Sequence, residues 1–227
     1  MNILAIDTSG SVCAVSVLQD KKVLVEVYVD NKKTHSQMLA PMIDDCLERA
    51  DLSLSDIDLF ACAIGPGSFT GLRIGVSMIK GFCQALNKKC VGVNTLDALA
   101  QNLLGEARIV CPVIDARRGD VYTASYTDNN RVSDYRATQL TDLLDELKGR
   151  EVVFIGDAAL NFKQEIVQAG FKVAHIGIAL PRASSVGLVA FAQSGNAVSA
   201  YELEPLYLRQ TQAEREYAKR NRKPNGS

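Results

Sequence analysis

The opening of this 227-residue chain is repeated, in outline, halfway along it. The segment IVCPVIDARRGDVYTASY, residues 109–126, can be laid over NILAIDTSGSVCAVSV, residues 2–17, with one inserted residue. Each copy is an apolar strand that ends in an aspartate, Asp7 or Asp115, followed by a turn and a returning strand of alternating residues. Because a repeated unit folds in the same way each time, the sequence predicts an α/β protein of two similar lobes.

Three strands joined by tight turns open the first copy. Apolar or alternating runs at 2–6, 12–18 and 23–29 predict an antiparallel meander. Helices then alternate with strands, and the predicted elements are 36–49 (helix), 59–64 (strand), 70–86 (helix), 90–93 (strand) and 96–104 (helix, capped by Thr95). Strands followed by such an alternation indicate a mixed sheet with helices packed on it.

The second copy continues in the same way after its two strands. The predicted elements are 140–147 (helix), 152–155 (strand), 160–169 (helix), 171–176 (strand), 184–193 (helix) and a strand-like segment at 204–210. We therefore expect an N-terminal lobe at 1–105, a C-terminal lobe at 106–213 and a polar, basic, flexible tail at 214–227. The basic residues of the tail could contact tRNA or an acidic partner, but a solvated terminus is the preferred interpretation.

A glycine-rich turn, GPGSFTG at 65–71, leads into the long helix, with Ser68 or Thr70 as its cap. Backbone N–H groups at such a turn can bind an anion, so one interpretation is a weak anion or nucleotide contact at Asp7, Ser68 and Arg73. The turn is not a P-loop, because the GxxxxGK[ST] lysine is absent, and it has no serine at the centre of GxSxG. Close packing of strand and helix is the preferred interpretation.

Three motifs carry a resemblance to a known family. GPGSFTGLRIG, the N-terminal ILAIDTSG and a late PLYLRQTQAE together resemble the TsaB (YeaZ) family of bacterial tRNA threonylcarbamoyladenosine biosynthesis proteins. The resemblance extends over the whole chain to about Glu216. It implies two ribonuclease-H-like lobes of the actin-like ATPase and sugar-kinase superfamily, with mixed sheets and helices.

The same resemblance implies a function without catalysis by this chain. Members of the family serve as a scaffold for TsaD, the paralogue that transfers threonylcarbamoyl to the adenosine beside the anticodon of tRNAs reading codons that begin with A. The implied partners are TsaD as a direct heterodimer, the ATPase TsaE in the assembly, a second copy of the chain in isolation, and tRNA indirectly. No tightly bound cofactor is expected, and a nucleotide could bind at the interface of the complex.

A free-standing actin-like small-molecule kinase or ATPase is the alternative function. Asp7 and Asp115 end the two opening strands, where two facing carboxylates could hold Mg²⁺ with a phosphate. The glycines that shape a phosphate loop are missing from both turns, and Asp7 could simply cap its own turn. The two histidines, His35 and His175, match neither the HxxxH pair of TsaD nor any metal-ligand cluster, so no catalytic or metal-binding residue is predicted.

Composition limits the remaining classes. A net charge of −1 and a pI near 6.1 argue against a general nucleic-acid binder, which would carry a basic field. Six cysteines without any CxxC pair are expected to be reduced thiols in the core. The absence of a targeting signal or a membrane-spanning run predicts a cytoplasmic protein that does not contact membranes.

The predicted helices 36–49 and 70–86 each carry more apolar residues than a single buried stripe requires. Soluble monomers seldom leave such a row of apolar residues exposed to solvent. A further row, Ser77, Gly81 and Ala85, consists of small residues. The predicted partner surface comprises Met38, Met42, Gly71, Ile74, Gly75, Met78 and Phe82, with the glycines expected to let a partner helix approach closely. The alternative is that these residues pack inside the lobe.

Overall fold

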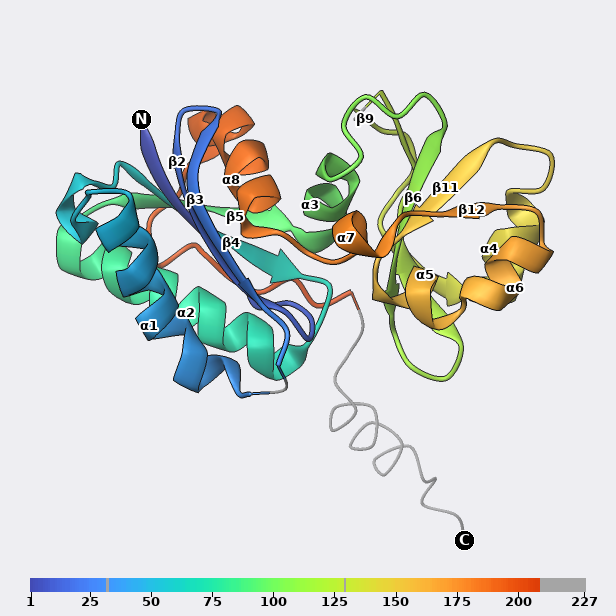
Figure 1. Ribbon diagram of the computed structural model, residues 1–227, viewed down its shortest axis with the longest axis horizontal. Coiled ribbons are helices and arrows are strands. Elements are labelled where there is room, and N and C mark those ends of the chain that lie inside the picture. Colours follow the sequence, from blue (N-terminus) through green and yellow to red (C-terminus); the bar gives the residue numbers. More distant parts are fainter. Residues whose placement is uncertain (32, 129, 209–227) are drawn as a thin grey trace, which may run out of the picture.

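Two β-sheets lie side by side, each covered by helices, in the computed structural model of the chain (Figure 1). The structure describes residues 1–31, 33–128 and 130–208. Within these ranges no helix is both long and apolar enough to cross a membrane. The predicted tail at 214–227 and the end of the strand-like segment at 204–210 lie outside the described residues.

The first sheet has five strands in the order β3-β2-β1-β4-β5. Its strands are β1 (Asn2–Asp7), β2 (Cys13–Gln19), β3 (Lys22–Val29), β4 (Leu59–Gly65) and β5 (Lys89–Asn94). The first three strands pair antiparallel, whereas β4 pairs parallel to both β1 and β5. The predicted meander is therefore present, and parallel pairing of the later strands makes the sheet mixed.

The second sheet repeats this order as β10-β7-β6-β11-β12, with the short pair β8 and β9 attached to β6. Its strands are β6 (Ile109–Asp115), β7 (Asp120–Thr123), β8 (Tyr126–Thr127), β9 (Asn130–Arg131), β10 (Arg136–Gln139), β11 (Val152–Ile155) and β12 (Lys172–Val173). The parallel and antiparallel pairings also match strand for strand. The internal repeat seen in the sequence is thus a repeat of the fold.

Helices cover the first sheet on both faces. Helices α1 (His35–Arg49) and α2 (Phe69–Leu86) cover one face, and α3 (Thr95–Gln101) and α8 (Ala183–Ala192) lie on the other (Figure 1). Leu4 and Ile6 of β1 point into the core under α1 and α2, whereas Ile3 and Ala5 point into the core under α8. Strands β1, β2 and β4 are buried on both sides, as their nearly continuous apolar runs require.

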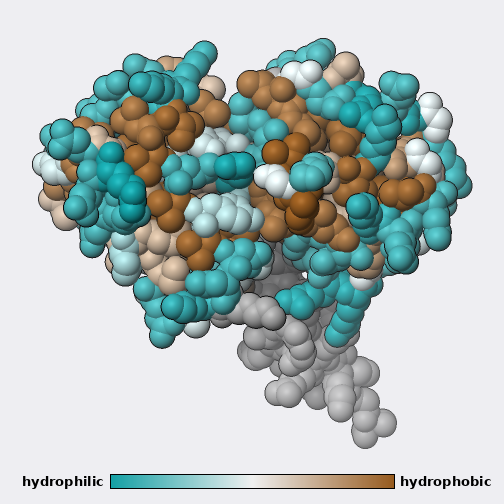
Figure 2. Space-filling view, viewed as in Figure 1, coloured by the Kyte–Doolittle hydropathy of each residue, from teal (hydrophilic) through white to brown (hydrophobic). Residues whose placement is uncertain are grey.

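The second sheet carries shorter helices, which are α4 (Leu140–Glu146), α5 (Asp157–Asn161), α6 (Lys163–Gln168) and α7 (Ile176–Ala179). Its main core contains Phe154 of β11, in edge contact with Phe171, together with Ile166 of α6. Figure 2 shows apolar side chains around α7, at the boundary between the lobes, where Ile176 is 59% exposed. Below, the first lobe means the first sheet with α1, α2, α3 and α8, and the second lobe means the second sheet with α4 to α7.

The chain returns to the first lobe near its end. Helix α8 packs against β1 and β2, where Gly187 lies directly against Leu18. Glu26 of β3 holds the start of α8, because its carboxylate accepts hydrogen bonds from the Arg182 side chain and from the Ser184 N–H. The second predicted range, 106–213, therefore includes a helix that belongs spatially to the first sheet.

Several local predictions need correction. Asn94, not Thr95, caps α3, because the Asn94 side chain accepts from the Leu96 N–H at 2.9 Å. The strand expected at 171–176 is limited to Lys172–Val173, and His175 instead caps α7 by accepting from the Gly177 N–H. The chain turns into a helix at His175 because the imidazole satisfies one of the free N–H groups there.

The expectation of reduced core thiols is confirmed. All six cysteines are buried and free, and their side chains lie among apolar residues of the two sheets. Together the sheets and helices form two lobes whose opening strands, β1 and β6, end near one another's loops. This arrangement positions the two sets of candidate residues described next.

Candidate functional site

The outer face of α1 and α2 is the first candidate, because both helices lie side by side on the same face of the first sheet (Figure 1). Four of the predicted partner residues, Met38, Ile74, Met78 and Phe82, are half-buried at its edge. The Phe82 ring packs against Phe60 of β4 at a centroid distance of 5.7 Å. These side chains are therefore partly used by the core and partly available to a partner.

Three predicted partner residues are buried inside the first lobe, so the prediction is wrong for them. Met42 is 5% exposed and belongs to the core between α1 and the sheet. A Cβ on Gly71 would lie 2.0 Å from the carbonyl oxygen of Thr8, and one on Gly75 would lie 2.5 Å from the Thr8 hydroxyl. The close approach that these glycines permit is to the turn after β1 in the same chain, not to a partner helix.

The row of small residues on α2 is the one that faces outward. Ser77, Gly81 and Ala85 are all exposed, and a Cβ on Gly81 would meet no atom within 4 Å. The row lies beside the half-buried Met78 and Phe82 along the same helix. The outer face of α2 is therefore a strip of small residues, with Met78 and Phe82 on one side and Lys80 and Gln84 on the other, which another helix can approach closely.

The glycine-rich turn is held against the turn after β1. Ser68 caps α2 by accepting from the Gly71 N–H at 3.2 Å, and its own N–H donates to the Ser9 carbonyl at 2.6 Å. A Cβ on Gly67 would lie 2.3 Å from the same Ser9 oxygen. The glycines thus serve close packing of loop on loop, which supports the preferred interpretation of this motif and identifies Ser68 as the cap.

Arg73 lies among aromatic groups. Its guanidinium carbon is 3.7 Å from the centre of the Phe69 ring, and its Nε donates to the Tyr207 hydroxyl at 3.1 Å. Phe69 and Tyr207 are themselves in ring contact at 5.2 Å. Arg73 therefore ties α2 to the segment that returns after α8. The predicted anion or nucleotide contact at Asp7, Ser68 and Arg73 remains a prediction, and each of the three has partners within the chain.

Asp7 is fully buried at the end of β1. Its Oδ1 accepts from the Ser9 N–H at 2.8 Å and from the Ser9 hydroxyl at 2.6 Å, as in a side-chain-capped turn. Its Oδ2 has no partner among the described residues. Burial raises the pKa of this carboxyl from its usual 3.8 to about 6, although the hydrogen bonds from Ser9 oppose the rise. Asp7 caps its turn, as one interpretation of the sequence expected.

The second lobe holds its aspartates differently. Asp115, at the end of β6, is half-buried and accepts from the Arg117 N–H at 2.7 Å. Asp157, at the start of α5, accepts from the Asp115 N–H and from the Ala158 N–H. Burial raises the pKa of Asp157, against the effect of these two N–H groups. Asp157 was not singled out from the sequence, although it follows the buried strand β11 as a helix-capping residue would.

The space between the two opening turns is small. Ser9, Gly10, Thr95, Asp157 and Pro181 are among the residues that line a pocket of about 20 Å³ there. Sites for small molecules usually have volumes of about 300 to 1,000 Å³. Among the described residues, no group of three or more His, Cys, Asp or Glu side chains could hold a metal ion.

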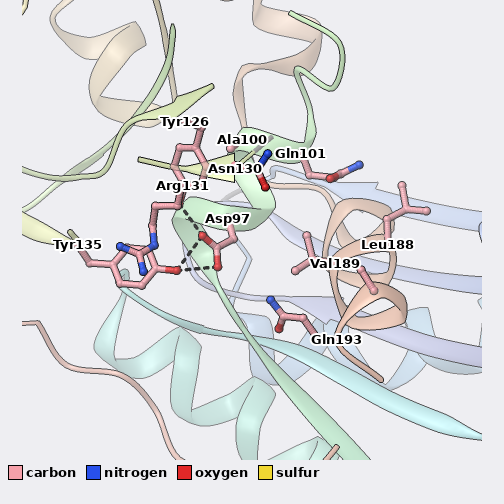
Figure 3. Close-up of a pocket in the computed structure, with 11 residues that line it drawn as sticks. Asp97, Ala100, Gln101, Tyr126, Asn130, Arg131, Tyr135, Leu188, Val189 and Gln193 are labelled. Carbon is pink, nitrogen blue, oxygen red and sulfur yellow. Dashed lines mark hydrogen bonds between the residues drawn. The ribbon is translucent and has the colours of Figure 1, made fainter. Parts of the chain in front are cut away.

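A larger pocket, of about 470 Å³, lies on the other side of α3, where the two lobes meet (Figure 3). Asp97 of α3 is at its centre and accepts from the hydroxyls of Tyr126 and Tyr135 at 2.6 to 2.8 Å. These residues were not predicted as a site from the sequence. A lone aspartate and two tyrosines some 30 residues apart form no recognisable motif, and only the contact between the lobes brings them together.

The chain is similar to proteins of one family over nearly its full length. A family model described as TsaD, tRNA N6-adenosine threonylcarbamoyltransferase, matches residues 23–217. The tRNA threonylcarbamoyladenosine biosynthesis protein TsaB of Bacillus subtilis (strain 168) is 34% identical over 94% of this chain and 96% of its own length. TsaB of Escherichia coli (strain K12) is 32% identical, over 92% of this chain and 95% of its own length.

Solved structures agree with this similarity. YeaZ from Pseudomonas aeruginosa superimposes with a TM-score of 0.73 at 27% identity, covering 91% of this chain and 99% of that one. A ROK hexokinase from Thermus thermophilus superimposes with a TM-score of 0.54 at 14% identity, covering 86% of this chain and all of that one, which is a likeness of fold alone. The predicted fold class, that of the actin-like ATPases and sugar kinases, is confirmed.

Proposed function

This chain belongs to the TsaB (YeaZ) family of tRNA threonylcarbamoyladenosine biosynthesis proteins, and from that premise we propose that it is a non-catalytic subunit of the assembly that makes this modification. Its direct partner is TsaD, the threonylcarbamoyltransferase to which it is paralogous, and TsaE joins the assembly. The modified base is the adenosine beside the anticodon in tRNAs that read codons beginning with A. In the absence of TsaD, two copies of the chain pair through the same surface.

The observation that carries this proposal is the outer face of α2. Ser77, Gly81 and Ala85 leave a strip of backbone exposed, and Met78 and Phe82 edge it with half-buried apolar side chains. Glycine in the middle of a helix costs about 1 kcal/mol relative to alanine. Among the residues that the structure describes, none packs closely against Gly81, since its Cβ position is open space. A partner helix packed on this strip is the gain that we propose.

The non-catalytic role is supported by the small size of the cleft between the turns after β1 and β6. The carboxylate of Asp7 has no exposed surface, and the loop at 65–68 is packed onto Ser9. The pocket that remains, of about 20 Å³, is far smaller than a nucleotide. We therefore propose that this cleft of the isolated chain binds no nucleotide tightly, that a nucleotide serving the modification reaction is bound at the interface of the complex, and that the tRNA substrate is held mainly through the partners.

The alternative, a free-standing kinase or ATPase, is suggested by the fold that the chain shares with the ROK hexokinase. A shared fold does not establish a shared reaction, since function depends on the groups at the site. Isothermal titration of the purified chain with Mg-ATP separates the two functions. Saturable binding at micromolar concentration that Ala192→Trp does not weaken would favour the kinase or ATPase, and its absence favours the scaffold.

The interface is tested with Gly81→Arg. A cation placed in a desolvated interface without a counter-charge costs several kcal/mol, so this variant should no longer co-elute with TsaD in gel filtration. The matched control is Gly195→Arg, because Gly195 is also exposed and also has no atom within 4 Å of its Cβ position. Circular dichroism is used to check that both variants are folded. A folded Gly81→Arg chain that still binds TsaD would remove α2 from the interface.

The absence of a catalytic role is tested with Asp7→Asn and Asp115→Asn in a reconstituted tRNA modification assay. Both variants should keep threonylcarbamoylation within a few-fold of normal, because neither carboxylate is assigned a chemical step. Binding to TsaD is measured in parallel. A folded variant that binds TsaD normally and yet loses all activity would contradict the non-catalytic proposal.

A further inference from the structure

The pocket of about 470 Å³ beside α3 is separate from the cleft between the opening turns. Thr95 and Leu99 of α3 line the small cleft, whereas Asp97 and Gln101 line the larger pocket. Residues two apart on a helix are about 200° apart around its axis, so the two spaces lie on opposite faces of α3. A ligand in the larger pocket would not occupy the place of the small cleft.

One wall of this pocket is apolar. Leu188, Val189 and Ala192 of α8 form it, together with Ala100 of α3. Figure 3 shows Asp97 between this wall and the Arg131 and Tyr135 side chains on the opposite side. A space of this volume, with apolar groups on one side, can hold a planar ring system.

The centre of the pocket is a fixed hydrogen-bond acceptor. Burial, together with the carboxylate of Asp97, raises the pKa values of Tyr126 and Tyr135, so both phenols stay protonated and donate to Asp97. An ionised carboxylate offers about four acceptor positions. The phenols use Oδ1 twice and Oδ2 once, which leaves Oδ2 able to accept from one N–H of a ligand.

Two amides and a cation surround this acceptor. Gln101 and Gln193 line the pocket, their side chains have no hydrogen-bond partner within the described ranges, and Gln193 extends from α8 toward Asp97 in Figure 3. The Arg131 guanidinium lies 4.1 Å from the centre of the Tyr135 ring, and Nη1 donates to the Ser133 carbonyl at 2.6 Å. Nη1 also lies 3.8 Å from the exposed carboxylate of Asp134. A guanidinium has five N–H groups, so the others can still donate to an anion.

From these contacts we propose that the pocket binds a nucleotide, with the base against the α8 wall and the phosphate toward Arg131. Amide and carboxylate side chains that offer donors and an acceptor together are suited to the edge of a base. A purely apolar ligand would leave these polar groups unpaired, and a purely cationic one could pair with Asp97 but not with Arg131. A nucleotide has the planar ring, the N–H groups and the anionic charge that this set matches.

The nucleotide could be free, or it could be part of an RNA chain whose base enters the pocket. The pocket would recognise the same groups in both cases, so the experiment tests free mononucleotides and an RNA separately. The inference goes beyond the proposed function and does not depend on TsaD, because α3 and α8 come from the first lobe and Arg131 and Tyr135 from the second within one chain. Bound ligand would therefore also raise the melting temperature.

The experiment uses the full ¹⁵N-labelled chain. AMP, GMP, CMP and UMP are titrated separately and followed by two-dimensional NMR, with adenosine and inorganic phosphate as reduced probes. We expect saturable shifts of the Gln101 and Gln193 side-chain amides with at least one mononucleotide, and weaker binding of adenosine and of phosphate. A fluorescently labelled unmodified tRNA transcript, followed by anisotropy, tests the RNA source.

Three variants locate the site. Ala192→Trp fills the pocket from an exposed position and should weaken binding at least tenfold. Gln193→Leu should weaken it about three- to tenfold, the loss of one hydrogen bond. Arg131→Gln should remove the preference for AMP over adenosine. The matched control is Gln168→Leu, on the exposed face of α6, which should bind as the unchanged chain does.

Each outcome decides the proposal. Binding of a mononucleotide or of the tRNA that Ala192→Trp abolishes and Gln168→Leu leaves intact supports it, and the arm that binds identifies the source. Failure of all four mononucleotides and of the tRNA to bind would overturn it. Binding that Ala192→Trp does not weaken, or binding of phosphate alone as tight as that of a mononucleotide, would also overturn it.

Discussion

The two lobes share one strand order but differ in the helices that cover it. The first lobe places the 18-residue α2 after its fourth strand, whereas the second places the 5-residue α5 and the 6-residue α6 at the corresponding point. A helix of 18 residues can bury one face on the sheet and still present a second face along about 27 Å. The repeat therefore accounts for the two sheets, and within the described residues only the first lobe follows its fourth strand with a helix long enough to present a second face.

The turns after β1 and β6 also differ between the two lobes. In both lobes a glycine lies against the backbone of the opening strand or its turn. Gly71 contacts Thr8 in the first lobe, and Gly156 contacts Val113 in the second. In the first lobe the loop before α2 also packs onto Ser9 and covers Asp7. The second lobe leaves Asp115 half-buried. In each lobe a glycine thus allows close packing on the opening strand or its turn. The additional loop of the first lobe leaves Asp7 fully buried, whereas Asp115 stays half-buried.

The largest effect is expected from Gly71→Ala. Its Cβ would lie 2.0 Å from the Thr8 carbonyl oxygen, so the helix must move away from β1 and the free energy of unfolding should fall by about 3 kcal/mol or more. Gly156→Ala, with φ of +117° and a Cβ 2.2 Å from the Val113 oxygen, should act similarly in the second lobe. Gly81→Ala is the control on the same helix as Gly71 and should stabilise by up to about 1 kcal/mol. Urea unfolding measures all three, and equal effects at Gly71 and Gly81 would contradict the packing described.

Asp7→Asn should change how stability depends on pH. The pKa of Asp7 is about 6 in the folded chain and near 3.8 when unfolded, so between these values the folded state holds a proton that the unfolded state has lost. Stability due to this group therefore falls as the pH rises from about 4 to 6, by about 3 kcal/mol at most. The variant should match the unchanged chain near pH 4 and exceed its stability at pH 7.

The control for this comparison is Asp157→Asn in the second lobe. Burial also raises the pKa of Asp157, but two backbone N–H groups lower it, so the variant should shift the pH dependence in the same direction and to a smaller extent. Urea unfolding from pH 4 to pH 7 gives the differences. A difference between Asp7→Asn and the unchanged chain that stays constant over this range would show that Asp7 does not titrate there.

Ser68→Ala should cost about 1 kcal/mol of stability, the usual effect of removing a helix cap. The sequence did not decide whether Ser68 or Thr70 caps α2. Thr70→Ala should change stability by less than about 0.5 kcal/mol, because the Thr70 side chain is exposed in the first turn of the helix. Ser68→Asp should restore the cap. If Thr70→Ala proves the more harmful of the two, α2 begins later than the structure indicates.

The smallest effect on stability is expected for a charge on an exposed helix face. Val167→Glu on α6 should change stability by less than about 0.5 kcal/mol, whereas Met78→Glu on α2 should cost about 1 kcal/mol, because Met78 is half-buried against the core. Their effects on TsaD should differ completely, with binding lost only for Met78→Glu. Loss of binding in both variants would mean that the partner surface extends over the second lobe as well.

Much of the fold followed from the sequence by itself. The repeat around Asp7 and Asp115, the meander and the helices α1, α2 and α8 were all predicted to within two residues of their bounds, because long periodic segments carry a strong signal. The strand Val152–Ile155 was predicted without error. Short elements such as β10 and α7 were missed or misassigned, since their few residues gain stability from contacts elsewhere rather than from a local pattern.

The tertiary structure decided which face of α2 is inside. The sequence shows three rows of small and apolar residues on this helix, but it does not show that Gly71 and Gly75 meet Thr8 while Gly81 meets nothing. It also does not show that α8 returns to the first sheet, or that Asp97 meets Tyr135 across the two lobes. These facts depend on contacts between residues far apart in the chain. Periodicity determines that a helix has a face to bury, and only the packing of the whole chain determines against what.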